Sequence, residues 1–162
     1  MSHVLLSLAQ LAVAILLSVI AVFLAFYLFQ WFTRDLDEWK ALRDGNAGVG
    51  IVLGAILISV AIVLRPALSL DTSTWDVGAA LFPKALLAEA VQLAVGLIVA
   101  LATVAFALSV FAWLTRGIDE VAELKKGNLA VAGLLAGVVI GVGLMVSQAM
   151  AQLMSAVSSL LF

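Results

Sequence analysis

Four long uncharged runs alternate with short polar stretches along the chain. The runs cover residues 4–33, 45–64, 90–115 and 127–162, with lengths of 30, 20, 26 and 36 residues. A helix needs about 20 consecutive apolar residues to cross the hydrocarbon core of a bilayer. Unpaired backbone amides are too costly in that core for an open structure, so each run is expected to be helical. The pattern therefore predicts an all-α membrane protein with four transmembrane helices.

The first run differs from a secretory signal peptide. It lacks a basic leading segment and a small-x-small cleavage site, and its only early ionisable side chain is His3. Its 30 residues also exceed the apolar region of a typical signal. We therefore expect it to be retained as a membrane helix.

The polar stretch after the first run is repeated 82 residues later. Residues 31–46 read WFTRDLDEWKALRDGN and residues 113–128 read WLTRGIDEVAELKKGN, with identity at 8 of 16 positions. In the ungapped alignment of residues 10–64 with residues 92–146, 19 of 55 positions agree. Apolar matches between membrane helices arise easily, but polar matches do not, so the chain is interpreted as a tandem duplication.

The duplication fixes the expected orientation of the spans. Each repeat contains two spans, an even number, so both repeats enter the membrane in the same direction. Both polar stretches then lie on one side, which carries six of the eight Lys and Arg residues. The positive-inside rule predicts that this side is cytoplasmic and that both termini face outward. We expect a single membrane domain, 1–162, made of repeat one (4–66), an outer loop (67–83) and repeat two (84–162).

We call residues 31–46 and 113–128 the first and second elbow. Each begins with a Trp suited to the headgroup level and continues as a short interfacial helix. Asp35 and Glu38 have the spacing of a capping box, although Gly117 replaces Asp35 in the second copy. A Gly then suits the left-handed residue that ends a helix, and an Asn can cap the next span. The repeated charged and turn residues are Arg34, Asp37, Glu38, Gly45 and Asn46 in the first elbow and Arg116, Asp119, Glu120, Gly127 and Asn128 in the second.

The repeated charges allow two interpretations. In one, they form a solvated loop that satisfies the topology rules. In the other, Arg34 and Arg116 pair across the repeats with the acidic residues of the opposite elbow. Exposed pairs contribute only about 0–1 kcal/mol, so such pairing would serve orientation or a cytosolic partner more than stability.

The duplicated elbow resembles that of a known family. An acidic pair followed by Gly-Asn, flanked by two spans and present twice, is similar to the YjfL-like bacterial inner-membrane family, domain of unknown function 350. The resemblance covers both repeats and includes Gln92-Leu93 early in the third helix. It implies a small four-span protein of the bacterial inner membrane, and it supplies no established activity, cofactor or catalytic residue.

Composition argues against enzymatic chemistry. The chain is 65% hydrophobic and 11% charged, with a net charge of −2, no basic patch for nucleic acid, and no cysteine. His3 is the single histidine, and no phosphate-cradling glycine loop is present. We therefore expect no enzyme, no cofactor and no metal site.

Polar side chains within the spans allow two interpretations. Gln10 and Gln92 occupy equivalent depths and either lock the two hairpins together or line a polar path with Gln148 and Gln152. Glu89 either lies at the outer interface near a helix N-terminus or, if deeper, binds a proton or cation beside Gln92.

Glycines at four-residue spacing mark faces where helices can approach closely. They are Gly50 and Gly54 in the second span and Gly133, Gly137 and Gly141 in the fourth. Such faces either pack inside the bundle or, for the fourth span, form a homodimer surface.

Two functions are consistent with these features. The first is a structural, scaffolding or accessory membrane protein, oligomeric, that contacts a cytoplasmic or membrane protein through its elbows. The second is a small channel or transporter for ions or small solutes with a Gln- and Glu-lined path. A path usually contains more buried ionisable residues than this chain has, which favours the first.

Overall fold

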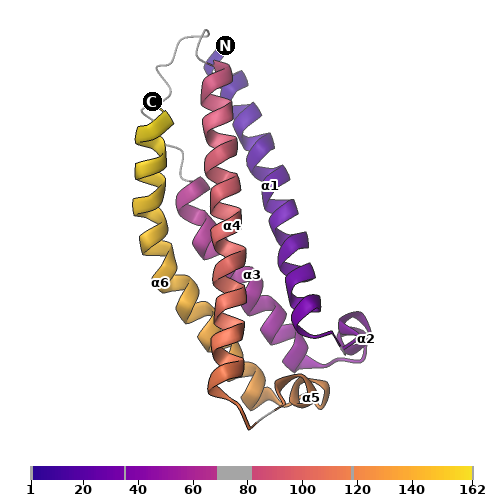
Figure 1. Cartoon of the computed structure of the whole chain (residues 1–162). Helices are drawn as coiled ribbons and strands as arrows, with labels where there is room; N and C mark the ends of the chain where they lie inside the picture. The colour runs from indigo at the N-terminus through magenta and orange to yellow at the C-terminus, as the bar shows by residue number, and fades with distance from the viewer. Residues whose placement is uncertain (1, 35, 69–81, 118, 162) are drawn as a thin grey trace.

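The computed structural model describes residues 2–34, 36–68, 82–117 and 119–161 (Figure 1). This part of the chain contains six helices: α1 (Ser2–Phe32), α2 (Glu38–Arg43), α3 (Ala47–Leu68), α4 (Phe82–Leu114), α5 (Glu120–Lys125) and α6 (Leu129–Leu161). Four of them, α1, α3, α4 and α6, are long and apolar enough to cross a membrane. The predicted all-α membrane protein with four spans is confirmed.

The two hairpins run in the same direction. Figure 1 shows α2 and α5 together at one end of the bundle, here called the elbow end, and both chain termini at the opposite end. The first hairpin is α1–α2–α3 and the second is α4–α5–α6. The predicted pair of same-orientation repeats is therefore confirmed.

Helix α3, the second span of repeat one, lies at the centre of the bundle. In the spanning part of α3, 50% of the residues are buried, compared with 11% in α1. The packed interior includes Phe29 and Phe111, which are equivalent positions of the two repeats and are almost completely buried. The duplicated sequence therefore places the same aromatic ring at the elbow end of both hairpins.

The helices α3 and α6 approach each other closely at Gly143. A Cβ atom added there would overlap the hydroxyl of Ser59, so a larger residue would force Ser59 to shift. The Ser59 hydroxyl donates a hydrogen bond to the backbone oxygen of Val139 at 3.1 Å. This bond satisfies a polar group that is fully buried between apolar helices.

Of the glycines with predicted packing roles, Gly50 faces a neighbour, because a Cβ there would lie 3.7 Å from the side chain of Leu42, and the other four do not. A Cβ at Gly54, Gly133, Gly137 or Gly141 would meet no atom of another part of the chain within 4 Å. Within one subunit, close approach of membrane helices instead occurs at Gly143 and at Gly96, where a Cβ would lie 2.7 Å from the Cβ of Ala67. The four-residue spacing therefore did not identify the glycines that pack the bundle internally.

Candidate functional site: the paired elbows

Each elbow is closed by an aspartate that caps its short helix. The Asp37 carboxylate accepts a hydrogen bond from the backbone N–H of Lys40 at 2.9 Å, and Asp119 accepts one from Ala122 at the same distance. The predicted capping box starting at Asp35 is wrong, because α2 begins one residue after Asp37. Asp35 itself lies outside the described residues. Both copies have an aspartate at the position that caps the short helix, Asp37 in the first and Asp119 in the second.

A threonine–glutamate hydrogen bond ties each span to the short helix that follows it. The Thr33 hydroxyl donates to Glu38 Oε1 at 2.5 Å, and Thr115 makes the same bond to Glu120. Thr33 is fully buried and Glu38 is only 5% exposed, whereas Glu120 is half-buried. Sequence reasoning missed this pair, although the identical Thr and Glu at five-residue spacing in both copies were a signal for it.

The Gly-Asn pair behaves as predicted. Gly45 and Gly127 have φ angles of 79° and 75°, the left-handed region that glycine adopts without strain. The Asn46 side-chain oxygen accepts from the N–H of Val49 at 3.2 Å, and Asn128 accepts from Ala130 at 3.1 Å. Each Asn therefore caps the span that leaves the elbow, and both predictions are confirmed.

Each repeated arginine stacks on the tryptophan three residues before it. The guanidinium carbon of Arg34 lies 5.2 Å from the ring centre of Trp31, and that of Arg116 lies 5.3 Å from Trp113. Both rings are exposed, as expected for residues at the level of lipid headgroups. Cation–π contacts of this kind contribute about 0.5–1 kcal/mol at exposed sites.

Of the two interpretations of the repeated charges, pairing across the repeats is not seen among the described residues. The two arginines stack on their own tryptophans, Asp37 and Asp119 act as caps, and Glu38 and Glu120 bond threonines. Over the described ranges, the one ion pair joins Lys126 to Glu123 at 2.7 Å within the second elbow. Each of these repeated charged groups has its partner in its own elbow, only a few residues away.

An asparagine makes a polar contact between the two elbows. The Asn46 amide donates to the backbone oxygen of Leu124, the buried leucine of the second elbow, at 2.7 Å. The equivalent Asn128 instead donates to Glu123 of its own elbow, also at 2.7 Å. Repeat one has Ala41 where repeat two has Glu123, so the Asn46 amide has no such acceptor nearby and reaches the other repeat.

In the second elbow, the pKa of the Glu123 carboxyl group is shifted by its neighbours. The hydrogen bond from Asn128, followed by the interaction with Lys126, lowers the pKa of Glu123 below its ordinary value of 4.5. The hydrogen bond to Glu123 and the negative charge of Glu123 raise the pKa of Lys126. Both groups are therefore charged at neutral pH, and Glu123 accepts the hydrogen bond from the Asn128 amide as a carboxylate.

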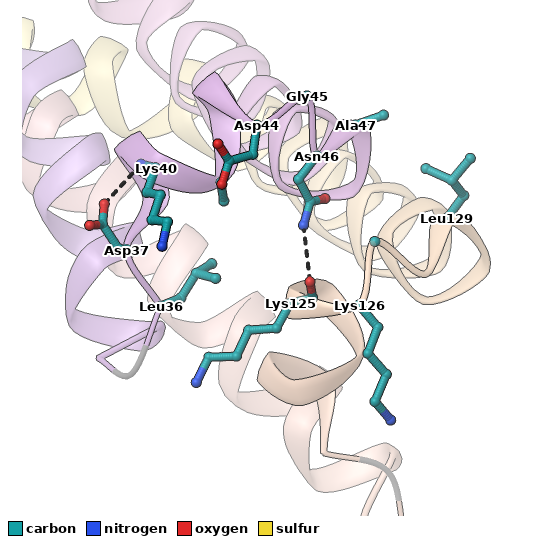
Figure 2. A pocket seen from close by; sticks show the side chains of 12 residues that line it. Leu36, Asp37, Lys40, Asp44, Gly45, Asn46, Ala47, Lys125, Lys126 and Leu129 are labelled. Atoms are coloured by element: carbon teal, nitrogen blue, oxygen red, sulfur yellow. Dashed lines mark hydrogen bonds between the residues drawn. The ribbon is translucent and has the colours of Figure 1, made fainter.

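A pocket of about 700 Å³ opens between the elbows (Figure 2). We call it the inter-elbow pocket, and it is lined by Leu36, Asp37, Lys40, Ala41, Asp44, Gly45, Asn46, Ala47, Lys125, Lys126, Gly127 and Leu129. In Figure 2, Lys126 extends away from the opening, in agreement with its ion pair to Glu123.

Three charged side chains of the pocket have no partner in the part of the chain that the structure describes. They are Lys40 and Lys125, with one positive charge each, and Asp44, with one negative charge. The charge differs between the copies at two of these positions: Lys40 corresponds to Ala122, and Asp44 to Lys126, whereas Lys125 corresponds to the equally charged Arg43. The pocket therefore arises from divergence between the repeats as well as from their symmetry.

The family comparison agrees with the duplicated fold. A family model described as Domain of Unknown Function (DUF350) matches the chain twice, over residues 3–88 and 85–162. The chain belongs to this family. The two matches begin 82 residues apart, which is the offset of the internal repeat. No curated protein and no solved structure matches the chain.

The DUF350 chain places its membrane glutamines in different surroundings. Gln92 on α4 is half-buried, whereas Gln148 and Gln152 are exposed on the surface of α6. The side chains of Gln10 and Glu89 lie outside the described residues. Gln148 and Gln152 therefore do not line a path through the interior of one subunit.

Proposed function

We propose that this DUF350 protein is an accessory protein of the bacterial inner membrane that holds a segment of a partner protein in its inter-elbow pocket. The four spans anchor the protein, and the two elbows present the pocket at one surface of the bilayer. In this proposal the protein works as a homo-oligomer, so each assembly presents more than one pocket. The observation that carries the proposal is that both repeats contribute to a single charged pocket.

The charge distribution supports a cytoplasmic position for the elbows. Six of the eight Lys and Arg residues lie in them, and the positive-inside rule associates such loops with the cytoplasm. Both termini then face the opposite side of the membrane. The partner is accordingly a cytoplasmic protein or the cytoplasmic part of a membrane protein.

The free charges of the pocket favour an acidic segment as its occupant. Lys40 and Lys125 are exposed ammonium groups, and Asp44 supplies one opposing carboxylate, so the unpaired charge is positive. Charge complementarity of this kind sets the choice of partner and the association rate more than it sets affinity. The pocket walls are fixed by the caps and by the Asn46 bridge, so binding orders little of the receptor.

Site-specific photo-crosslinking in membranes tests the proposal. A photoreactive amino acid at Ala41, which lines the pocket, is expected to give a discrete protein adduct, whereas the same group at the exposed Phe106 on α4 gives only lipid adducts. The double variant Lys40→Glu/Lys125→Glu should abolish the adduct through charge repulsion. The neighbouring variant Arg43→Glu should retain it, because Arg43 is exposed on the same elbow as Lys40 and does not line the pocket.

Two results would count against the proposal. One is an adduct pattern at Ala41 that matches the pattern at Phe106. The other is flux of small cations or polyamines in proteoliposomes that depends on Gln92, which would favour the channel or transporter alternative.

A further inference from the structure

One exposed face of α1 carries a row of aromatic rings that ends in a cation. Phe23, Tyr27 and Trp31 follow one another at four-residue spacing and therefore share one face of the helix. They are 71%, 68% and 55% exposed, respectively. The Arg34 guanidinium closes the row, with its central carbon 5.2 Å from the centre of the Trp31 ring. We call these four residues the α1 cluster.

The length of the α1 cluster matches one leaflet of a bilayer. Phe23 and Trp31 are eight positions apart in the sequence. This separation is about 12 Å along a helix that rises about 1.5 Å per residue. A hydrocarbon core about 30 Å thick gives each leaflet about 15 Å. With Trp31 at the headgroup level, the aromatic row therefore spans most of the depth that one lipid chain occupies.

Helix α2 lies beside the end of α1 rather than beyond it (Figure 1). The ring of Trp39 on α2 packs against Phe26 of α1, with 4.8 Å between the ring centres. Phe26 is six positions before Phe32, where α1 ends. The contact therefore lies about 9 Å inside the end of the helix. This arrangement keeps the first elbow, including Arg34, at the depth of the lipid headgroups.

Over the described residues, Arg34 has no carboxylate partner. Its guanidinium stacks on Trp31 and forms no ion pair. Stacking covers one face of the guanidinium and leaves its N–H donors free, and these donors match two oxygens of a phosphate group. The two elbows together carry seven acidic and six basic side chains, so their net charge does not attract an anion. Attraction of an anion therefore requires a local site, which Arg34 supplies.

We propose that the α1 cluster binds one anionic phospholipid of the leaflet at the elbow end. The lipid phosphate accepts hydrogen bonds from Arg34, and an acyl chain lies along Tyr27 and Phe23. A zwitterionic headgroup carries its own ammonium group, which competes with the guanidinium for the phosphate, whereas phosphatidylglycerol has no such group. This inference goes beyond the proposed function and does not rest on it, because the α1 cluster and the inter-elbow pocket have no residue in common.

The second repeat has the stacked arginine without the aromatic row. The guanidinium carbon of Arg116 lies 5.3 Å from the centre of the Trp113 ring. The small residues Ala105 and Ser109 stand at the positions of the first two aromatic residues of the α1 cluster. Because they offer an acyl chain less surface, the second repeat provides a matched comparison for the first.

Photo-crosslinking in vesicles with equal amounts of phosphatidylglycerol and phosphatidylcholine tests the proposal. A photoreactive phenylalanine analogue at Tyr27 keeps an aromatic ring there. It should capture phosphatidylglycerol about tenfold more often than phosphatidylcholine, the ratio expected when one charge-assisted hydrogen bond separates the two lipids. The same analogue at Phe106, which is 62% exposed on α4, is the control and should capture both lipids in their bulk ratio. Equal capture of the two lipids at Tyr27 would overturn the proposal.

Arginine variants in the same vesicles assign the preference to its residue. Arg34→Gln should bring capture at Tyr27 to the bulk ratio. Arg116→Gln, the equivalent change in repeat two, and Arg43→Gln, at an exposed position of α2, remove the same charge and should leave the preference intact. The two lipids are compared within one sample, so a lower protein yield does not alter the ratio. A preference that survives Arg34→Gln, or that is lost equally in all three variants, would contradict the assignment.

Inorganic phosphate separates a lipid site from a site for a soluble anion. An excess of inorganic phosphate should leave the preference at Tyr27 unchanged, because this ion has no acyl chain to lie along the aromatic row. Loss of the preference on adding phosphate would assign Arg34 to a soluble anion and overturn the proposal.

Discussion

The two elbows share one set of internal hydrogen bonds but differ in how they connect to the rest of the molecule. Both have the aspartate cap, the threonine–glutamate bond, the left-handed glycine and the stacked arginine. In the first elbow Glu38 is buried, and the Asn46 amide donates a hydrogen bond to the other repeat. In the second elbow Glu120 is half-buried, and the Asn128 amide donates to Glu123 of the same elbow.

This difference shows that the shared and the differing residues of the two copies have different structural roles. Residues that both copies retain build the local turn, because a turn is specified by neighbours within a few positions. Residues that differ between the copies, such as Ala41 and Glu123, decide how the elbows meet. The inter-elbow pocket lies at this junction and is lined in part by residues that differ between the copies.

The largest expected effect comes from the threonine–glutamate bond. Thr33→Val removes the hydroxyl that bonds the buried Glu38, and leaving that carboxylate without its donor is expected to cost about 2–3 kcal/mol of stability. Thr115→Val should cost about 1 kcal/mol or less, because the half-buried Glu120 can bond water. Thermal unfolding of both variants in the same detergent measures the difference. Equal losses would show that burial does not distinguish the elbows.

The asparagines are expected to follow in size. Asn46→Ala removes both a helix cap and the bond to Leu124, a loss of about 2 kcal/mol when a cap and a hydrogen bond each contribute about 1 kcal/mol. Asn128→Ala removes a cap and a bond at the more exposed elbow, so about 1 kcal/mol is expected. Unfolding in detergent again gives the comparison, and a larger loss for Asn128→Ala would contradict it.

A double-mutant cycle tests why Asn46 crosses between repeats. Ala41→Glu gives the first elbow the acceptor that Glu123 supplies in the second, so it should draw the Asn46 amide away from Leu124 and cost about 1 kcal/mol. In the Asn46→Ala background the same substitution should be nearly neutral. The coupling energy between the two sites is the measured quantity, and a value near zero would refute the explanation.

The smallest expected effect concerns the pH dependence of the second elbow. Because the folded pKa of Glu123 is lowered, its charge stabilises the fold above pH 4.5, and this contribution is lost as the pH falls through the folded pKa. Glu123→Gln should therefore lower the unfolding temperature slightly at pH 7, and the difference from the parent protein should shrink as the pH falls below 4.5. A difference that did not shrink on acidification would assign the effect to something other than the charge.

The sequence predicted those features that depend on local or repeated signals. The four spans followed from uncharged length, and the glycine turns and asparagine caps followed from conformational preferences that act over a few residues. The same-orientation hairpins followed from an even number of spans per repeat. In each case the determining residues are close together in the chain or recur at a fixed offset.

Features that depend on how the hairpins pack were missed or wrong. The spacing of Gly133 and Gly137 did not show which face of α6 they occupy, whereas Gly143 meets Ser59 without belonging to that pattern. Of the two interpretations left open for Arg34, pairing with the opposite elbow is not seen, and its guanidinium lies over the ring of Trp31 instead. Asn46 and Leu124 are 78 residues apart in sequence, and their contact depends on how the two elbows are placed relative to each other, which the pattern of apolar residues does not predict.

Side-specific labelling of single cysteines tests the central claim that both elbows lie on one face of the membrane. The variants Asp44→Cys and Lys126→Cys occupy equivalent positions that both line the pocket, and the chain offers no other thiol. A membrane-impermeant maleimide should label both in inverted vesicles and neither in intact spheroplasts. Labelling of the two cysteines from opposite sides would contradict the same-orientation duplication and remove the basis for a shared pocket.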